Sequence, residues 1–133
     1  MKVFHFLVVI FVFCFFSNNF CFGDNDRHRR FRAYEGRASW YGPQFFGKEM
    51  ANGDTYDKSD IFIAHRHLPL GTRVRIINLD NGRKVTVEVT DRGPYTKKKG
   101  RFHREVDLSY KAAQILGAIE DGIIPVKIIP LKN

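Results

Sequence analysis

The chain has 133 residues and a formal net charge of +8 at pH 7. Both cysteines (Cys14 and Cys21) and 8 of the 13 phenylalanines fall in residues 1–23, and the other 110 residues contain 21 Lys and Arg against 14 Asp and Glu. A stretch of 110 residues suffices for one hydrophobic core, which argues against a multidomain enzyme. It contains no thiol, which excludes a disulfide scaffold or a cysteine-based zinc site there.

The N-terminus has the pattern of a secretion signal. Lys2 precedes a run rich in Val, Ile and Phe over residues 3–16. A short basic start followed by an apolar run of this length is typical of a signal peptide, and Gly23 is a small residue suited to the cleavage site. We therefore predict a signal peptide over residues 1–23 and a mature protein that works in the periplasm or elsewhere in the cell envelope.

Membrane association is expected only if this segment is retained or modified. The apolar run is shorter than the roughly 20 residues that a membrane span needs. An uncleaved signal would still anchor the chain, and so would a lipid on Cys21. Phe20 is bulky where a lipoprotein site has a small residue, so lipidation of Cys21 is disfavoured.

Residues 24–35 are predicted to form a flexible basic arm, because four arginines fall between positions 27 and 32. A solvated linker is the simpler interpretation, and attraction to an anionic envelope polymer is the other. Net charge alone would permit nucleic acid as a partner. The chain has no base-stacking motif, however, so we predict no nucleic-acid partner.

The rest of the chain has the pattern of short strands separated by turn residues. Strands are predicted over residues 37–41, 61–65, 72–79, 84–90 and 124–131. Two of these, 72–79 and 84–90, alternate apolar with polar residues, as half-buried strands do. They flank Asn81-Gly82, which is the strongest short-range signal for a hairpin.

One helix is predicted after Asp107, with Asp107 or Ser109 as its N-cap and Gly117 ending its first part. Five apolar residues fall on one face of this helix: Leu108, Ala112, Ile115, Leu116 and Ile119. Several short strands with one helix, and no alternation of the two, predict a mainly β, single-domain barrel.

Three stretches are more polar than a strand scaffold needs: 51–57, 64–72 and 90–95. Asp91 is the leading candidate because the alternating strand before it delivers its carboxyl group at the edge of the core. Partial loss of water there favours the neutral acid, which can donate a proton to a leaving oxygen. The alternative is that Asp91 caps its turn or pairs with Arg92.

His65 has three interpretations: a catalytic partner, a group that hydrogen-bonds sugar, or a core histidine with satisfied nitrogens. The residues alone favour the third. His65, His67, Asp54 and Asp57 lack a further ligand at metal-site spacing. We therefore predict no metal and no cofactor.

Aromatic and basic residues lie close to these polar stretches. Trp40 and Tyr41 are candidates to stack on sugar rings, whereas most aromatic residues of this kind belong to a core. The basic loop 97–101 (KKKGR) follows the Asp91 turn. It is either a solvated face or the border of a groove that holds an anionic polymer.

Taken together, these stretches resemble the rare lipoprotein A (RlpA) family. The motifs ASWYG, ANGDTYD, AHRHLPLGT, NLDNGR, TDRGPY and VDLSYKAAQILG occur in that order, and the resemblance covers about residues 36–130. Each motif is weak alone, but the ordered set is highly specific. The resemblance implies a six-stranded double-psi β-barrel with one short helix over residues 36–131.

The resemblance also implies an endolytic peptidoglycan lytic transglycosylase, which cleaves the MurNAc–GlcNAc bond and leaves 1,6-anhydroMurNAc ends. It implies Asp91 as the catalytic acid–base group, and one such group suffices because the muramic 6-hydroxyl replaces water. The other residues expected to bind substrate or support the site are Asp54, Asp57, His65, Trp40, Tyr41, Arg92 and Tyr95. The expected partner is the peptidoglycan glycan strand, and the expected state is a monomer.

The chain departs from the family pattern in three ways. Asp54 stands where the family usually has Glu, no lipoprotein box precedes a cysteine, and no C-terminal glycan-binding repeat domain follows. Septal targeting is therefore not predicted. The alternative function is a non-catalytic, expansin-like protein that binds peptidoglycan or another polysaccharide. Retention of Asp91 favours the enzyme, since a pure binder could do without the acid.

Overall fold

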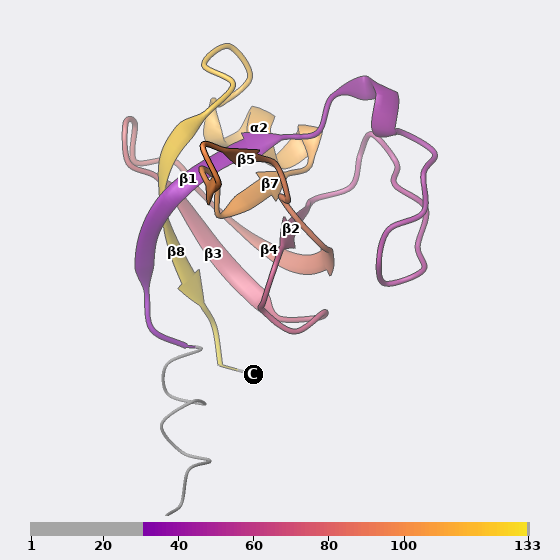
Figure 1. The fold of residues 1–133 in the computed structure, drawn as a ribbon, viewed down its shortest axis with the longest axis horizontal. Helices are drawn as coiled ribbons and strands as arrows, with labels where there is room; N and C mark the ends of the chain where they lie inside the picture. Colours follow the sequence, from indigo (N-terminus) through magenta and orange to yellow (C-terminus); the bar gives the residue numbers. More distant parts are fainter. Residues whose placement is uncertain (1–30, 133) are drawn as a thin grey trace, which may run out of the picture.

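The computed structural model describes residues 31–132, so the predicted signal peptide and most of the predicted basic arm lie outside the described residues. Six strands form a closed barrel in the spatial order β1-β7-β2-β4-β3-β8 (Figure 1). They are β1 (Tyr34–Trp40), β2 (Phe62–His65), β3 (Arg73–Asn78), β4 (Lys84–Asp91), β7 (Val106–Leu108) and β8 (Ile124–Pro130). The prediction of a mainly β, six-stranded barrel is confirmed.

Four smaller elements complete the described chain. They are the 3-10 helix η1 (Pro43–Phe45), strands β5 (Lys97–Lys98) and β6 (Arg101–Phe102), and helix α2 (Tyr110–Leu116). Strands β5 and β6 pair only with each other. The long connection from β1 to β2, which contains η1, extends to one side of the barrel (Figure 1).

The predicted hairpin at Asn81-Gly82 joins β3 to β4, with Val74 paired to Val87 across the two strands. Gly82 has a φ of 74°, a conformation that glycine adopts without strain. The side-chain amides of Asn78 and Asn81 both donate to the carbonyl oxygen of Leu116, at 2.8 and 2.9 Å. The hairpin turn thus satisfies a carbonyl at the end of α2 and ties the helix to the barrel.

Of the two predicted N-caps Ser109 is confirmed, whereas Asp107 as the cap and Leu108 as the first residue of the helical face are wrong. Both residues belong to β7, which is parallel to β1 and antiparallel to β2, so that its backbone bonds close the barrel. Helix α2 begins only at Tyr110, and Ser109 caps it by accepting from the amide of Ala112. The predicted apolar face is also incomplete, because Ile115 is 36% exposed.

Strand β1 begins at Tyr34, which is three residues earlier than predicted and inside the range assigned to the basic arm. The reason is its antiparallel partner: β8 pairs with β1 from Tyr34↔Ile128 to Ala38↔Ile124. A row of backbone hydrogen bonds to a neighbouring strand therefore extends β1 beyond its apolar residues.

The interior of the barrel is filled by alternate residues of its strands, including Val74, Ile76, Val89 and Ile128, all fully buried. A second cluster outside the barrel joins Met50, Tyr56 and Phe62, and Tyr41, Phe45 and Phe46 pack against it. This aromatic cluster attaches the β1–β2 connection to the barrel wall. Within residues 31–132, no helix is long and apolar enough to cross a membrane.

Candidate active site

Two carboxylates lie on the same face of the barrel wall. Asp107 of β7 pairs with Ser39 of β1 and with Ala64 of β2, and Ala64 pairs in turn with Asp91 of β4. Residues opposite each other in neighbouring strands point to the same face, so these four form one row. Two strand spacings place the Cα atoms of Asp91 and Asp107 roughly 10 Å apart.

Asp91 ends β4 half-buried, with one donor on each carboxylate oxygen. The phenol of Tyr41 donates to Oδ2 at 2.9 Å, and the amide of Ala51 donates to Oδ1 at 3.0 Å. A carboxylate oxygen has two lone pairs, so each retains one for a substrate hydroxyl or a proton. The two donors therefore hold the group in place without using up its acceptor capacity.

The turn at residues 50–54 reaches Asp91 because it is bound to the end of β4. The amide of Asn52 donates to the carbonyl oxygen of Thr90 at 3.0 Å. Within the turn, the amide of Met50 donates to the carbonyl oxygen of Asp54 at 2.8 Å. The carboxylate of Asp54 is exposed and accepts from the side chain of Asn52 at 2.9 Å. The structure thus brings the turn that carries Asp54 beside Asp91.

Asp107 is the site residue that sequence reasoning missed. Its Oδ1 accepts from the hydroxyl of Ser39, and Nη1 of Arg104 lies 3.8 Å from the same oxygen. Burial, with a smaller effect from the charge of Asp91, raises the pKa of Asp107. An acid between two buried residues in the pattern Val-Asp-Leu was the signal available, but it was assigned to a helix start.

His65 is a core histidine with both ring nitrogens engaged. Nδ1 accepts from the amides of His67 and Leu68 at 3.0 and 2.8 Å, so the proton lies on Nε2, which is 2.7 Å from the Tyr34 hydroxyl. The side chain is 6% exposed, and burial lowers the pKa of His65 to about 4. Its role in this geometry is to fix the turn after β2.

Arg92 has a similar positioning role. Its Nη1 donates to the carbonyl oxygens of His65 and Leu68, at 3.0 and 2.5 Å. The residue next to Asp91 is therefore bonded to both ends of the turn that His65 fixes. The guanidinium joins β4 to this turn instead of pairing with the Asp91 carboxylate.

The remaining predicted site residues lie in other surroundings. Asp57 is exposed and accepts from the amide and hydroxyl of Ser59, which lowers the pKa of Asp57. Trp40 lies edge-on to Tyr110, with ring centroids 5.7 Å apart. Tyr95 is 62% exposed. The structure thus joins Tyr41 and Asp91 directly and brings the Asp54 turn to them, but it places Asp57 in a separate turn.

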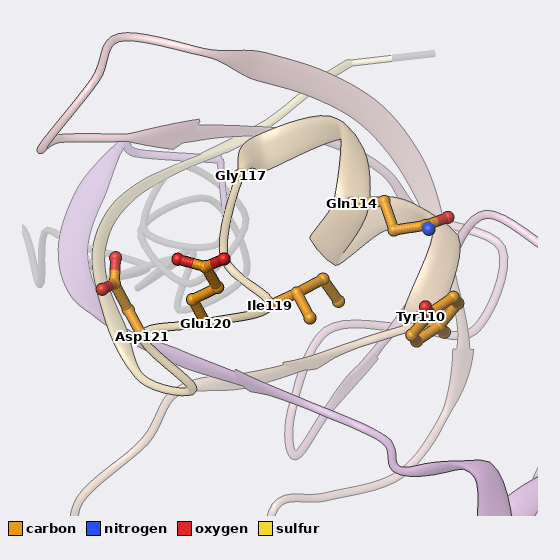
Figure 2. A pocket seen from close by; sticks show the side chains of 6 residues that line it. All are labelled: Tyr110, Gln114, Gly117, Ile119, Glu120 and Asp121. Atoms are coloured by element: carbon orange, nitrogen blue, oxygen red, sulfur yellow. The ribbon is translucent and has the colours of Figure 1, made fainter.

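Helix α2 and the turn after it border a hollow of about 460 Å³ (Figure 2). Its lining residues are Tyr110, Gln114, Gly117, Ile119, Glu120 and Asp121. None of these was predicted as a site residue, although Trp40 touches one of them. No group of three His, Cys, Asp or Glu residues within 31–132 is arranged to hold a metal ion.

Residues 33–128 match the family model described as lytic transglycolase, and the chain therefore belongs to that family. It is 46% identical over 103 residues to the probable endolytic peptidoglycan transglycosylase RlpA of Aquifex aeolicus, covering 77% of this chain and 43% of that protein. It is 48% identical over 99 residues to the endolytic peptidoglycan transglycosylase RlpA of Pseudomonas aeruginosa PAO1. This match covers 73% of this chain and 28% of that protein. The resemblance to RlpA is confirmed, and the chain spans less than half the length of these relatives.

Solved structures with the same fold are more distant in sequence. The expansin of Clavibacter michiganensis has a TM-score of 0.58 at 22% identity, covering 77% of this chain and 52% of that one. The Streptomyces papain inhibitor has a TM-score of 0.55 at 22% identity. This match covers 74% of this chain and 94% of the inhibitor. These likenesses concern the fold alone, and they agree with a double-psi β-barrel.

Proposed function

We propose that this protein is an endolytic peptidoglycan lytic transglycosylase that cleaves the MurNAc–GlcNAc bond and leaves 1,6-anhydroMurNAc ends. The observation that carries the proposal is the Asp91 carboxylate, half-buried at a strand end and held by Tyr41 and the Ala51 amide. The names of the RlpA relatives support the same activity.

The reaction needs one proton to be donated and one to be accepted. Protonated Asp91 gives its proton to the GlcNAc oxygen as the C1–O4 bond breaks with its electron pair going to that oxygen. The muramic 6-hydroxyl then forms the O6–C1 bond and returns its proton to Asp91. No water enters, so the group ends in its starting state.

Asp107 supports this cycle from the same face of the barrel wall. A carboxyl group that loses water on burial favours its neutral form, and a nearby negative charge acts in the same direction. Burial and the charge of Asp91 act on the pKa of Asp107 in this direction. A neutral Asp107 would add no second negative charge to the site, and the donor role stays with Asp91.

The cellular setting follows from the same proposal. The substrate and partner is the peptidoglycan glycan strand, and the site of action is the periplasm or another part of the cell envelope. A cleaved signal peptide over residues 1–23 would deliver the chain there, and the protein would act as a monomer without metal or cofactor.

The test compares the purified protein with Asp91→Asn and with Asp80→Asn, a matched change in the exposed turn of the β3–β4 hairpin. Each is incubated with sacculi, and 1,6-anhydroMurNAc ends are counted by mass spectrometry. We expect ends from the wild type and Asp80→Asn, and a loss of roughly 100-fold or more in Asp91→Asn.

Three other results would contradict the proposal. Full activity in Asp91→Asn would remove this residue from the acid–base role. Reducing ends would show a hydrolase that uses water. Binding to sacculi without any product would favour the non-catalytic, expansin-like wall protein.

A further inference from the structure

The outer surface of β3 and β8 alternates cations with isoleucines. Arg75 of β3 pairs directly with Ile129 of β8, and Ile77 pairs with Lys127 two positions further along. The residues between them in both strands are buried inside the barrel. Successive side chains of a strand point to opposite faces, so these four point outward together.

The neighbouring strands extend this surface and give it a positive charge. The outward residues that pair across β4, β3, β8 and β1 include five cations and two acids: Arg37, Arg73, Arg75, Lys84 and Lys127 against Glu35 and Glu88. These cations with Ile77 and Ile129 are called the basic face below. The two ion pairs between side chains of residues 31–132 join Arg66 to Glu105 and Arg104 to Asp107, so neither uses a cation of the basic face.

The basic face lies on the opposite side of the barrel from the candidate active site. In the closed order β1-β7-β2-β4-β3-β8, strands β3 and β8 stand across from β7 and β2 (Figure 1). Strands β7 and β2 carry Asp107 and Ala64, the middle of the row that ends at Asp91. A surface that touched the basic face would therefore leave the Asp91 row open to a polymer on the other side.

The N-terminal end of β1 brings more cations to the edge of the basic face. Tyr34, the first residue of β1, pairs with Ile128 of β8, and Arg32 just before it is exposed. In the sequence, three further arginines stand at positions 27, 29 and 30, and an apolar run covers residues 3–16. The chain thus adds positive charge where it enters the barrel beside β8.

We propose that the basic face binds the surface of an anionic phospholipid bilayer, with the Asp91 row turned away from the membrane. Lys and Arg attract the phosphates of such lipids, and apolar side chains between them contact the boundary of the acyl layer. A soluble polyanion would use the cations alone, since it offers no apolar layer to Ile77 and Ile129. The sequence ties membrane association to the N-terminal segment, whereas this contact belongs to the barrel itself.

The β5–β6 hairpin offers a matched set of cations outside the basic face. Lys98 pairs with Arg101, and both line a hollow of about 490 Å³ together with Lys99 and His103. The hairpin is held at its base, where Nη1 of Arg66 donates to the carbonyl oxygens of Pro94 and Arg104 at 2.9 and 2.6 Å. Substitutions in β5 and β6 leave both of these bonds in place, so the hairpin can lose charge as a control.

The experiment measures co-sedimentation with phosphatidylcholine vesicles, with and without phosphatidylglycerol, at low and high salt. Arg75→Gln/Lys127→Gln removes two cations of the basic face, and Lys98→Gln/Arg101→Gln removes two from the hairpin. Ile77→Ser/Ile129→Ser removes the apolar contacts. Each variant is made as the full chain, so that the N-terminal segment contributes equally, and circular dichroism checks that each is folded.

We expect Arg75→Gln/Lys127→Gln to lose roughly tenfold or more in affinity for phosphatidylglycerol vesicles at low salt, and less at high salt. Ile77→Ser/Ile129→Ser should lose affinity at both salt concentrations, because apolar contacts are not screened. The hairpin variant should bind as the wild type does. Asp91→Asn should also bind as the wild type does, so the membrane contact is tested whether or not the protein cleaves glycan.

Three results would overturn the inference. Equal losses for the basic-face and hairpin cations would indicate a general attraction of cations to anionic surfaces. Unchanged binding of Arg75→Gln/Lys127→Gln would assign membrane binding to the N-terminal segment alone. Unchanged binding of a folded Ile77→Ser/Ile129→Ser would mean that the face contacts no apolar layer, as expected for a soluble anionic polymer.

Discussion

The phenol of Tyr41 donates a 2.9 Å hydrogen bond to Oδ2 of Asp91, although the two residues are 50 positions apart. Burial, followed by the charge and the hydrogen bond of Asp91, raises the pKa of Tyr41 well above its ordinary value. The phenol therefore keeps its proton near neutral pH and is always a donor. Its ring lies against Phe45 and Phe62 in the aromatic cluster, so the donor is fixed in place.

Tyr41→Phe should lower kcat by roughly tenfold with a smaller change in KM, because hydrogen bonds to charged groups contribute about 1.5–3 kcal/mol. The ring packing is kept, and only the orientation of Asp91 is lost. Tyr56→Phe is the matched control, since its hydroxyl accepts from the amide of Tyr110 and does not contact a carboxylate. Kinetics on sacculi with both variants check this, and equal kcat values in the two would contradict the positioning role.

Asp107→Asn should change how stability depends on pH. The pKa of Asp107 is raised in the folded state. Its contribution to the free energy of unfolding is therefore complete below the ordinary Asp pKa and is lost as pH rises through the pKa of the folded state. The amide does not titrate and can still accept from Ser39. Urea unfolding between pH 3.5 and pH 7 should show a smaller loss of unfolding free energy in the variant than in the wild type. Parallel curves would show that burial does not affect this acid.

Protonation of His65 should lower the free energy of unfolding at acid pH. Its folded pKa is about 4, below the ordinary value of 6.5, so the unfolded chain takes up the proton first. Stability is complete above pH 6.5 and declines toward pH 4, by up to about 3 kcal/mol at ~1.4 kcal/mol per pKa unit. NMR of the ring protons should give a midpoint near 4. A midpoint near 6.5 would mean that the His65 ring is not buried in solution.

The barrel was predictable because its strongest signals are local. Alternation in two strands and Asn81-Gly82 between them define the β3–β4 hairpin, whose pairing lies within about twenty residues. Strand β7 was missed because three residues carry too little periodicity. Its place depends on hydrogen bonds to β1 and β2, whose paired residues lie more than forty positions away.

The candidate site was predictable only in part for the same reason. Asp91 follows from the strand that precedes it, whereas Tyr41 is predicted only to stack on sugar, and its hydrogen bond to Asp91 has no local signal. Asp107 could not be placed beside Asp91 without the register through Ala64, which joins three strands that are distant in sequence. The residues favour a core histidine at His65, but the partner of its Nε2, Tyr34, lies in the range predicted to be a flexible arm and could not be named.

Two hydrogen bonds from the guanidinium of Arg66, to the carbonyl oxygens of Pro94 and Arg104, fix both ends of the β5–β6 hairpin to the barrel. Everything beyond those two carbonyl groups can change in length or charge while the barrel wall keeps its shape. A graft of the β5–β6 hairpin from a relative should therefore leave the barrel wall and the Asp91 carboxylate in place.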